Sequence, residues 1–379
     1  MRVDRDVELK WENMYRGIHA QVDWLRTGPA ELFESARQSL MTVPPRIYLV
    51  GCGDSHYVGL ATRLAFERWS GIATEALESL EFSRYAIESA PAGSWVVCVS
   101  NSGRVARTVE CAIYAKRHGL FPIAITYHAD SNLAKASSAT IPFRYTDVGF
   151  GPGTLSYLAS MVGLYVVALR AGELSGKLDS AASASWLEKI QQQADVLAAT
   201  ITASEPAASE LGKKSDAQTP VHIIGAGPNY GTALFGMAKM IEAARVSAVG
   251  QELEEWAHEQ YFCTGPGTVT MVIAPLGASS SRAREQLQAV RDMEGTAVVI
   301  CSPDDTETAS LADVVFPVPG FQDEALTPLA YCVPLELFAY YFASTKGLTM
   351  LGFNDSNRME VNFRQIFGSE IVTLENSTN

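Results

Sequence analysis

The chain has 379 residues, enough for two or three domains that each bury a core of their own. Its 42 acidic residues outnumber its 29 basic ones, and the net charge of −13 argues against nucleic acid or an anionic membrane as a partner. The six cysteines are scattered without a C-x-x-C pair, and no apolar export signal follows the charged N-terminus. We therefore expect a soluble cytoplasmic protein with free thiols.

The first half of the chain alternates between helices and short apolar strands. The predicted elements are a helix over residues 5–40, a strand at Arg46–Val50, a helix at Tyr57–Ser70, a strand at Trp95–Ser100, a helix through Val109 and Ile113, and a strand at Pro122–Thr126. The apolar run Leu158–Leu169 is too short to span a bilayer and predicts a buried helix. This alternation is typical of βαβ units around a parallel sheet.

The same pattern then repeats in the second half. Residues 221–227 (Val-His-Ile-Ile-Gly-Ala-Gly) restate residues 47–53 (Ile-Tyr-Leu-Val-Gly-Cys-Gly), and strands at Thr270–Ala274 and Ala297–Cys301 follow in step. We predict two homologous α/β halves related by pseudo-twofold symmetry. The expected organisation is a helical segment 1–29, a domain 30–175, a helical linker 176–206 with a helix at Ala184–Thr200, a domain 207–345 and a tail 346–379.

Glycines end the first strand of the first half. Gly51-x-Gly53-x-Ser55 lies between a strand and a helix, where backbone N–H groups and the helix dipole attract an anion. The loop lacks the third glycine of a dinucleotide-binding fingerprint, so no nicotinamide cofactor is expected. A plain strand–helix turn is the alternative interpretation.

The next strand ends in Ser100–Gly103 (Ser-Asn-Ser-Gly), directly before a helix. Arg104 adds a cation, and Thr108 follows one turn later. Such donors at a helix N-terminus predict a site for a phosphate monoester, although a serine-rich helix cap would use the same residues. The second half has Ala274–Gly277 at the matching place, and only Ser279–Ser281 follow. We therefore expect one phosphate site per chain.

Acid–base chemistry is best placed between residues 239 and 258. Glu242 interrupts an apolar helix, and Lys239 precedes it by three residues, so the carboxylate is either a base or half of a solvated ion pair. His258 stands among glutamates, where an imidazole suits proton transfer near neutral pH or simply belongs to a solvated acidic helix start. The six histidines show no metal-ligand spacing, so no metal is expected.

Together these motifs resemble the sugar isomerase (SIS) superfamily. They are a G-C-G-x-S loop, an S-x-S-G loop before a helix, two repeated halves, and an Ala-Lys-x-x-Glu helix that leads to a later His. The nearest resemblance, over about residues 30–365, is to the isomerase half of glucosamine-6-phosphate synthases and to the fructosamine-6-phosphate deglycases. It implies two tandem SIS domains, each a doubly wound, flavodoxin-like α/β/α sandwich, in a homodimer that binds a phosphorylated sugar.

The resemblance also implies roles for particular residues. It places Glu242 on the base that moves a proton between C1 and C2, His258 on a ring-opening histidine that reaches the neighbouring subunit's site, and Lys239 on a lysine near the base. The positions that it implies for substrate and phosphate contacts are Gly53, Ser55, Ser100, Asn101, Ser102, Thr108, Gly153 and Thr154.

Departures from the synthase pattern narrow the expected reaction. The sequence holds no glutamine-hydrolysing domain, Val361 stands at the place of the synthase's Schiff-base lysine, and no lysine follows Lys346. Asn101 replaces a Gln, and Val105 replaces a phosphate-contacting Thr. The resemblance therefore implies a cofactor-free isomerase or deglycase for a ketose or amino-ketose 6-phosphate. An aminosugar-phosphate deaminase and a non-catalytic phosphosugar sensor are the alternatives.

Overall fold

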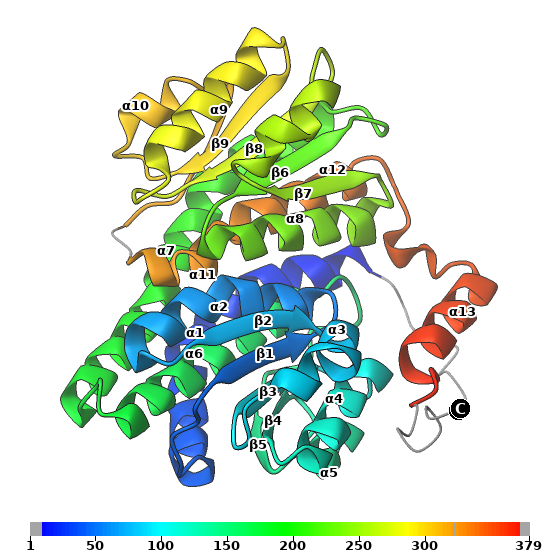
Figure 1. Ribbon diagram of the computed structural model, residues 1–379. Helices are drawn as coiled ribbons and strands as arrows, with labels where there is room; N and C mark the ends of the chain where they lie inside the picture. The colour runs from blue at the N-terminus through cyan, green and yellow to red at the C-terminus, as the bar shows by residue number, and fades with distance from the viewer. Residues whose placement is uncertain (1–9, 321–322, 372–379) are drawn as a thin grey trace.

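Two parallel five-stranded sheets form the centres of the two halves of the molecule (Figure 1). This computed structural model describes residues 10–320 and 323–371. The first sheet has the order β2-β1-β3-β4-β5 and the second the order β10-β9-β8-β6-β7. The first order is that of doubly wound flavodoxin-like sheets. The second sheet has the same order when it is read from β7 to β10. The predicted α/β class with two tandem halves is confirmed.

The strands and helices have the following bounds. The strands are β1 (Ile47–Gly51), β2 (Thr74–Glu78), β3 (Trp95–Val99), β4 (Phe121–Thr126), β5 (Ala139–Pro142), β6 (Val221–Gly225), β7 (Ala248–Glu252), β8 (Val269–Ala274), β9 (Thr296–Cys301) and β10 (Val314–Pro317). The α-helices are α1 (Trp11–Ser39), α2 (Asp54–Ser70), α3 (Ser79–Arg84), α4 (Ala106–Arg117), α5 (Asn132–Ala136), α6 (Leu155–Ser175), α7 (Ser180–Lys214), α8 (Pro228–Ala244), α9 (Ser280–Asp292), α10 (Thr306–Ala309), α11 (Pro328–Tyr331), α12 (Val333–Ser344) and α13 (Ser356–Phe367). The 3-10 turns are η1 (Ala86–Ser89), η2 (Glu255–His258), η3 (Gln260–Cys263), η4 (Glu324–Leu326) and η5 (Met350–Gly352).

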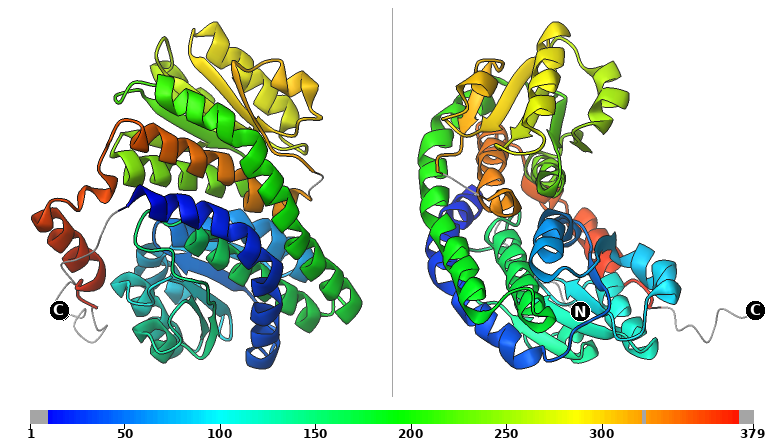
Figure 2. Two further views of the ribbon diagram at one scale, coloured as in Figure 1. Left: turned by 180° about the vertical axis from the view of Figure 1, so that it is seen from behind. Right: turned by 60° about the vertical axis from the view of Figure 1, so that its left-hand side comes forward.

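Helices α2, α8 and α12 lie between the two sheets, and α7 runs along the outside of both halves (Figure 2). One apolar cluster extends through this layer, from Leu49 in β1 to Ile300 in β9. Because the two halves share this core, their separation would expose a large apolar area, and they hold a fixed relative position. A site between them is therefore pre-formed.

Two helical stretches, Leu155–Ser175 and Glu324–Ser344, are long and apolar enough to cross a membrane by length and composition alone. In each stretch 89% of the apolar window is buried inside the protein. Both therefore serve as core helices of this fold, and the first contains the buried helix predicted at Leu158–Leu169.

The helices α1 and α7 cross the expected domain boundaries. The predicted helix Ala184–Thr200 is too short, because α7 continues to Lys214 and contains Pro206 in its interior. Buried residues recur along this continuation at Ile201, Ser204, Ala208 and Leu211, and this helical stripe packs on α12. The boundary placed after residue 206 thus falls inside one helix.

The repeat extends to backbone detail at the first helix of each half. Gly53 and Gly227 are the N-cap residues of α2 and α8, with φ of 56° and 55° and ψ of −128° and −127°. A residue with a side chain rarely adopts this conformation, so glycine is required at both positions. The two helices start in the same way, and side chains at equivalent positions can be compared directly.

Candidate active site

Two loops meet at the carboxyl edge of the first sheet, where doubly wound proteins bind ligands. The first runs from Gly51 into α2, and the second, the serine loop (Ser100–Val105), runs from β3 into α4. Their contact is made below the surface, where Sγ of Cys52 lies 3.8 Å from Oγ1 of Thr108. Ser55, in the first turn of α2, is half-buried beside them.

The serines of the serine loop shape a turn and do not cap α4. Oγ of Ser100 accepts the N–H of Gly103 at 3.2 Å, and Oγ of Ser102 accepts the N–H of Arg104 at 3.3 Å. The N-cap residue of α4 is Val105, whose side chain makes no capping hydrogen bond. The serine-rich cap considered above is therefore not formed, and the first N–H groups of α4 lack a side-chain acceptor. This is the arrangement that suits a bound anion.

Two of the predicted contact residues point away from the loop surface. Thr108 is fully buried, and its Oγ1 lies 3.1 Å from Oγ of Ser79, so it supports the loop from below. Thr154 is also buried, and its Oγ1 faces α1, where a Cβ added to Gly17 would lie only 2.5 Å away. Both residues were expected to touch substrate or phosphate. Thr108 packs beneath the serine loop, whereas Thr154 lines the cavity that Asn101 also lines.

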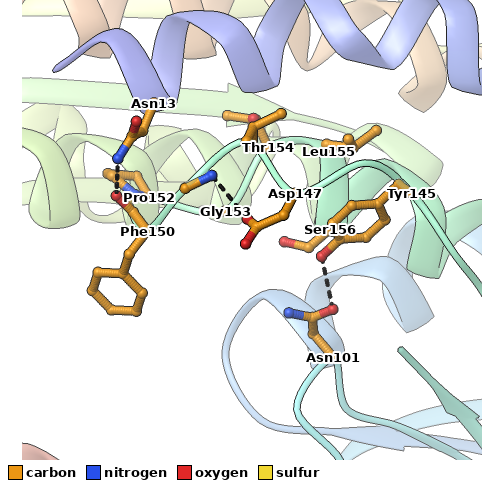
Figure 3. A pocket seen from close by; sticks show the side chains of 13 residues that line it. Asn13, Asn101, Tyr145, Asp147, Phe150, Pro152, Gly153, Thr154, Leu155 and Ser156 are labelled. Carbon is orange, nitrogen blue, oxygen red and sulfur yellow. Dashed lines mark hydrogen bonds between the residues drawn. The ribbon is translucent and has the colours of Figure 1, made fainter. Parts of the chain in front are cut away.

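Asn101 faces a cavity of about 300 Å³ that the loop Asp147–Gly153 encloses (Figure 3). The hydroxyl of Tyr145 donates to Oδ1 of Asn101 at 3.0 Å, which orients the amide. Gly153 and Ser156 line the same cavity. Asn101 of the serine loop and Gly153 of the later loop were both predicted contact residues, and they line the same cavity.

Lys239 joins the two halves of the site. Its side chain is fully buried on α8, and its Nζ donates to Oδ2 of Asp54 at 2.8 Å and to Oε2 of Glu242. Asp54 begins α2 in the first half, so one ammonium links the phosphate-side loop to the predicted base. Asp54 thereby directs a carboxylate oxygen to a cation, which explains how an acidic residue is tolerated beside an anion site.

Glu242 lies at a cavity wall and has a raised pKa. Its side chain is 30% exposed at the wall of a second cavity, of about 780 Å³, which Gly153 also lines. Burial raises the pKa of Glu242 to about 7, against the lowering effect of Lys239, while Asp54 adds to the rise and the backbone of Gly153 opposes it. Burial by itself lowers the pKa of Lys239, but the carboxylates of Asp54 and Glu242 raise it above its ordinary value. A carboxyl that titrates near neutral pH beside a permanent cation can both accept and return a proton.

A further acid lies in the helix layer behind Lys239. Glu336 on α12 is fully buried, and its Oε2 accepts a hydrogen bond from Nε2 of Gln21 at 2.7 Å. Burial raises the pKa of Glu336 to about 8, although Gln21 and Lys239 lower it. At neutral pH Glu336 is mostly protonated and uncharged, so Asp54 and Glu242 are the carboxylates that pair with the ammonium of Lys239.

His258 lines neither the cavity that Asn101 faces nor the cavity beside Glu242. It lies in η2, beyond β7, where its side chain is 66% exposed and its Nε2 is 3.6 Å from Oε1 of Glu254. Within one chain it is therefore a surface residue. This position agrees with the implied role only if His258 serves the site of a neighbouring subunit.

The tail returns to the site as helix α13. Arg104 of the serine loop stacks on Phe367, with 5.0 Å between the guanidinium carbon and the ring centroid, and Arg107 donates to the carbonyl oxygen of Glu370. Val361, at the implied lysine position, is exposed and does not line the cavity beside Glu242. Arg358 and Asn362 line it instead.

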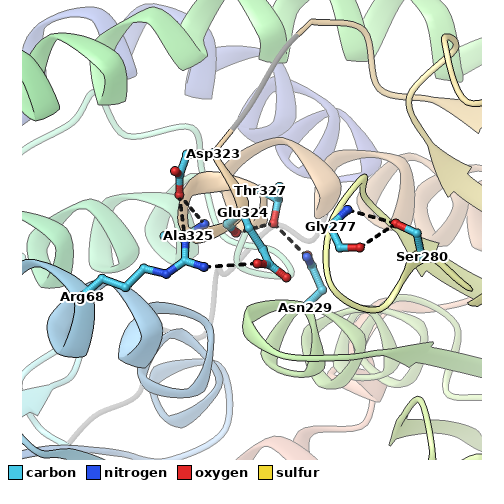
Figure 4. Close-up of polar contacts among 8 residues, drawn as sticks. All are labelled: Arg68, Asn229, Gly277, Ser280, Asp323, Glu324, Ala325 and Thr327. Carbon is cyan, nitrogen blue, oxygen red and sulfur yellow. Dashed lines mark hydrogen bonds and ion pairs between the residues drawn. The ribbon is translucent and has the colours of Figure 1, made fainter. Parts of the chain in front are cut away.

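Acidic side chains lie beside the equivalent loop of the second half (Figure 4). Arg68, which repeats the position of Glu242, forms ion pairs with Asp323 and Glu324, both at 3.3 Å. A Cβ added to Gly277 would lie 3.2 Å from Oε1 of Glu324, and the N–H of Gly277 donates to Oγ of Ser280. A carboxylate thus lies against the loop that would have to bind an anion.

Sequence reasoning missed three residues of the site. Asp54 follows Gly53 in the first loop, but its partner Lys239 lies 185 residues away in the chain, so no local pattern indicates their contact. Arg245 and Arg358 were not considered, although both line the cavity beside Glu242. The spacing of Arg245, three residues after Glu242 on the same helix, is the signal that indicates its place.

Two curated proteins show what the sequence of this chain resembles. The glutamine–fructose-6-phosphate aminotransferase [isomerizing] of Gloeobacter violaceus is 28% identical over 346 residues, which cover 88% of this chain and 56% of the relative. The corresponding protein of Thermotoga maritima is 26% identical, over 82% of this chain and 51% of the relative. The chain thus spans about half the length of the curated relatives that it matches.

Solved structures agree with this fold. The C-terminal domain of glucosamine-fructose-6-phosphate aminotransferase from Francisella tularensis superposes with a TM-score of 0.80 at 18% identity, over 92% of this chain and 99% of that one. Tagatose-6-phosphate ketose/aldose isomerase from Escherichia coli superposes with a TM-score of 0.71 at 14% identity, over 89% and 93% of the two chains. The SIS domain family matches residues 40–170 and 216–346, one segment in each half. The chain therefore belongs to the SIS-domain family and carries two SIS domains.

Proposed function

We propose that this protein is a phosphosugar isomerase or deglycase, which moves a proton between C1 and C2 of a ketose or amino-ketose 6-phosphate. The observation that carries the proposal is the state of Glu242. Its carboxyl has a pKa of about 7, lies at a cavity wall and is held by the buried Lys239. The names of the relatives, an aminotransferase of fructose 6-phosphate and a tagatose-6-phosphate isomerase, support a 6-phosphate as the substrate.

In isomerisation, the carboxylate of Glu242 takes the proton from C1 of the open-chain ketose, the electrons of the C–H bond form the C1–C2 double bond, and the C2 oxygen takes up a proton from solvent to give an enediol. The acid form of Glu242 then returns its proton to C2, the C1 hydroxyl gives up its proton to solvent, and the carbonyl group is left at C1. Lys239 keeps the carboxylate in place during both steps, since it donates to Oε2. Well-placed acid–base groups typically contribute a rate gain of about 10²–10⁴-fold.

In deglycation, the same proton transfer acts on a ketose whose C1 carries an amine. Removal of the C1 proton gives an enaminol, and protonation at C2 gives the C1 imine of the aldose phosphate. Water then adds to C1, and the C–N bond breaks to release the amine. This reaction needs no redox partner, because C2 is reduced from a ketone to an alcohol while C1 is oxidised to the level of an aldehyde.

The serine loop supports a 6-phosphate at the other end of the substrate. Ser102 and the uncapped first turn of α4 supply donors, and Arg104 supplies a positive charge. Amino transfer through a Schiff base is not proposed, because Val361 takes the implied lysine position. The proposed assembly is a homodimer in which His258 serves the site of the neighbouring subunit.

The test is exchange of the C1 and C2 protons of fructose 6-phosphate and other ketose 6-phosphates with deuterium from the solvent, followed by NMR. The Glu242→Gln variant should lose exchange by about 10²-fold or more while it still binds the phosphate ester. The exposed Glu210 forms only an ion pair with Lys214 on α7, and Glu210→Gln provides the matched control. Unchanged exchange in Glu242→Gln would remove Glu242 as the base.

The same experiment separates the alternatives. A non-catalytic sensor would bind sugar phosphates, as a rise of the melting temperature, without exchange in the wild-type chain. A deaminase would release ammonia from an aminosugar phosphate, and product analysis detects it. Exchange together with release of an organic amine from an amino-ketose phosphate is the result expected of a deglycase.

A further inference from the structure

An amide and a carboxyl meet where α1 packs on α12. Gln21 and Glu336 are both fully buried, and Nε2 of Gln21 donates to Oε2 of Glu336 at 2.7 Å. The second oxygen of each group, Oε1 of Gln21 and Oε1 of Glu336, is also buried and has no hydrogen-bond partner in the part of the chain that the structure describes. Two acceptors at one contact thus lack a donor, although buried polar groups are rarely left unpaired.

A second buried glutamate shows what a buried carboxylate normally requires. Glu110 on α4 is fully buried, and both Arg84 and Arg107 donate to its carboxylate. Within the described part of the chain, no arginine or lysine forms such a pair with Glu336, and burial without a cation favours the protonated form of a carboxyl. One proton on Oε1 of Glu336, donated to Oε1 of Gln21, would give both oxygens a partner.

The contact between α8 and α12 brings Glu336 near the ammonium of Lys239. Leu335 packs on Gly236 of α8, where an added Cβ would lie 2.7 Å from Cδ1 of that leucine, and Lys239 follows Gly236 by about one helical turn. Burial raises the pKa of Glu336, and the charge of Lys239 lowers it. The two groups are therefore close enough to interact, although Lys239 donates its hydrogen bonds to other carboxylates.

The other titratable groups around Glu336 provide no second cation. Those whose charges interact with it are Lys239 of α8, Asp54 of α2, Tyr157 of α6 and Cys332 at the start of α12. Groups on other helices reach α12 at least one turn away, at Tyr340, at Tyr341 or at the helix ends: Glu12, Tyr15 and His19 of α1, Glu205 of α7, Tyr331 of α11, and Lys346 after α12. Lys239 is thus the cation that an ionised Glu336 would attract.

We propose that Glu336 is a positioning residue, which carries a proton in the active protein and so leaves the ammonium of Lys239 to the base Glu242. This inference rests on the proposed function, because it concerns the same base. An ammonium has three N–H donors, and Asp54 and Glu242 accept two of them. When Glu336 ionises, its carboxylate competes for Lys239, and Glu242 loses part of the contact that holds it in place. Ionisation of this buried acid therefore sets an upper pH limit for proton transfer.

The test is the pH dependence of deuterium exchange in wild-type protein and in Glu336→Gln. The substituted glutamine keeps the shape of the side chain and can donate to Oε1 of Gln21, but it cannot ionise. Wild-type exchange should rise through about pH 7, where Glu242 ionises, and then fall by about tenfold over one to two pH units above about 8. Glu336→Gln should keep the rise and lose the fall. A purely structural role would instead lower the rate equally at every pH.

Two further variants keep the test decisive. Gln21→Met removes the hydrogen bond that lowers the pKa of Glu336, so the fall should move to higher pH. Glu205→Gln is the matched control, because Glu205 is a half-buried acid that reaches α12 at Tyr341, away from Lys239, and this variant should keep the wild-type profile. A fall that is absent from wild-type protein, or that persists unchanged in Glu336→Gln, overturns the proposal.

Infrared spectroscopy observes the proton without any turnover. Wild-type protein at pH 7 should show the C=O stretch of a buried protonated carboxyl, and the band should vanish in Glu336→Gln but remain in Glu242→Gln. A spectrum that Glu336→Gln leaves unchanged refutes the protonated acid. If the band behaves as expected but no ketose phosphate exchanges its protons, the proposed function fails and with it the positioning role, whereas the buried proton of Glu336 stands.

Discussion

Removal of the charge of Lys239 tests the central contact of the site. Lys239→Met keeps an unbranched side chain that packs near Phe235, whose ring centroid is 4.9 Å from Nζ, but it deletes the ammonium. Loss of one partner from a buried ion pair typically costs about 3–5 kcal/mol. Asp54 and Glu242 retain 26% and 30% of their side-chain exposure, so water can partly replace the cation. We therefore expect a destabilisation of about 3 kcal/mol, at the low end of that range.

The same substitution should change the pH dependence of catalysis. Lys239 lowers the pKa of Glu242, which burial raises to about 7. A base must be ionised to accept a proton, so wild-type exchange should rise as the pH increases through about 7. Without the ammonium, the pKa of Glu242 should increase further, and the rise in activity should move to higher pH by about one unit or more.

Urea denaturation measures the stability loss, and the exchange rate between pH 5 and 9 measures the shift. Lys214→Met is the control, because Lys214 forms an exposed ion pair with Glu210 that is worth less than about 1 kcal/mol. The double variant Lys239→Met, Asp54→Asn should recover part of the stability, since only one carboxylate then lacks its partner. Wild-type stability together with an unshifted pH profile in Lys239→Met would refute the contact as the organiser of the site.

Three other predictions follow from the site and its surroundings. Glu336 has a pKa of about 8 in the folded chain against an ordinary 4.5, so the unfolded chain loses its proton first, and stability should fall as the pH rises between those values. Glu336→Gln can keep the hydrogen bond of Gln21 and should flatten that fall in pH-dependent denaturation; an equally steep fall would contradict the buried acid. Ser102→Ala should raise KM for a sugar phosphate by about tenfold but leave the affinity for the dephosphorylated sugar unchanged, and equal effects on both would argue against a phosphate contact. Mixing Glu242→Gln and His258→Ala chains should restore some exchange if His258 serves the neighbouring subunit, whereas no recovery indicates a site within one chain.

The central strands were predictable from the sequence, and the edge strands were not. Every residue of β1, β3, β6 and β8 is buried, so each strand reads as a short apolar run. Strands β2 and β7 border the sheets and are only partly buried, and Thr74–Glu78 contains two glutamates. A half-covered strand of five residues leaves no apolar run to recognise.

The site was predictable where its residues are close in the chain. Lys239 and Glu242 face the same way because they are three residues apart on one helix, and their pairing was one of the two expectations, although it was expected in solvent and Lys239 is buried. The link from Lys239 to Asp54 depends on the packing of α2 against α8, which no local pattern encodes. The same reason hides the approach of Arg245 and Arg358 to Gly352, since 113 residues separate the two arginines in the chain.

The two halves differ most at the point where their shared architecture would place two equal sites. Arg68 of α2 and Glu242 of α8 occupy equivalent positions, yet Arg68 forms an ion pair with Glu324 of η4, whereas Glu242 lies at the wall of an open cavity. The two equivalent positions thus carry opposite charges, and each charge has a different effect on the loop beside it. In the second half, Arg68 holds Asp323 and Glu324 over the loop of Gly277, where a carboxylate repels a phosphate. At the serine loop of the first half, the N-cap residue of α4 makes no side-chain hydrogen bond, and the carboxylate of Glu242 is paired with Lys239. Because the duplicated sheets supply two equivalent frameworks, the expectation of one phosphate site per chain rests on side-chain charge and not on the fold.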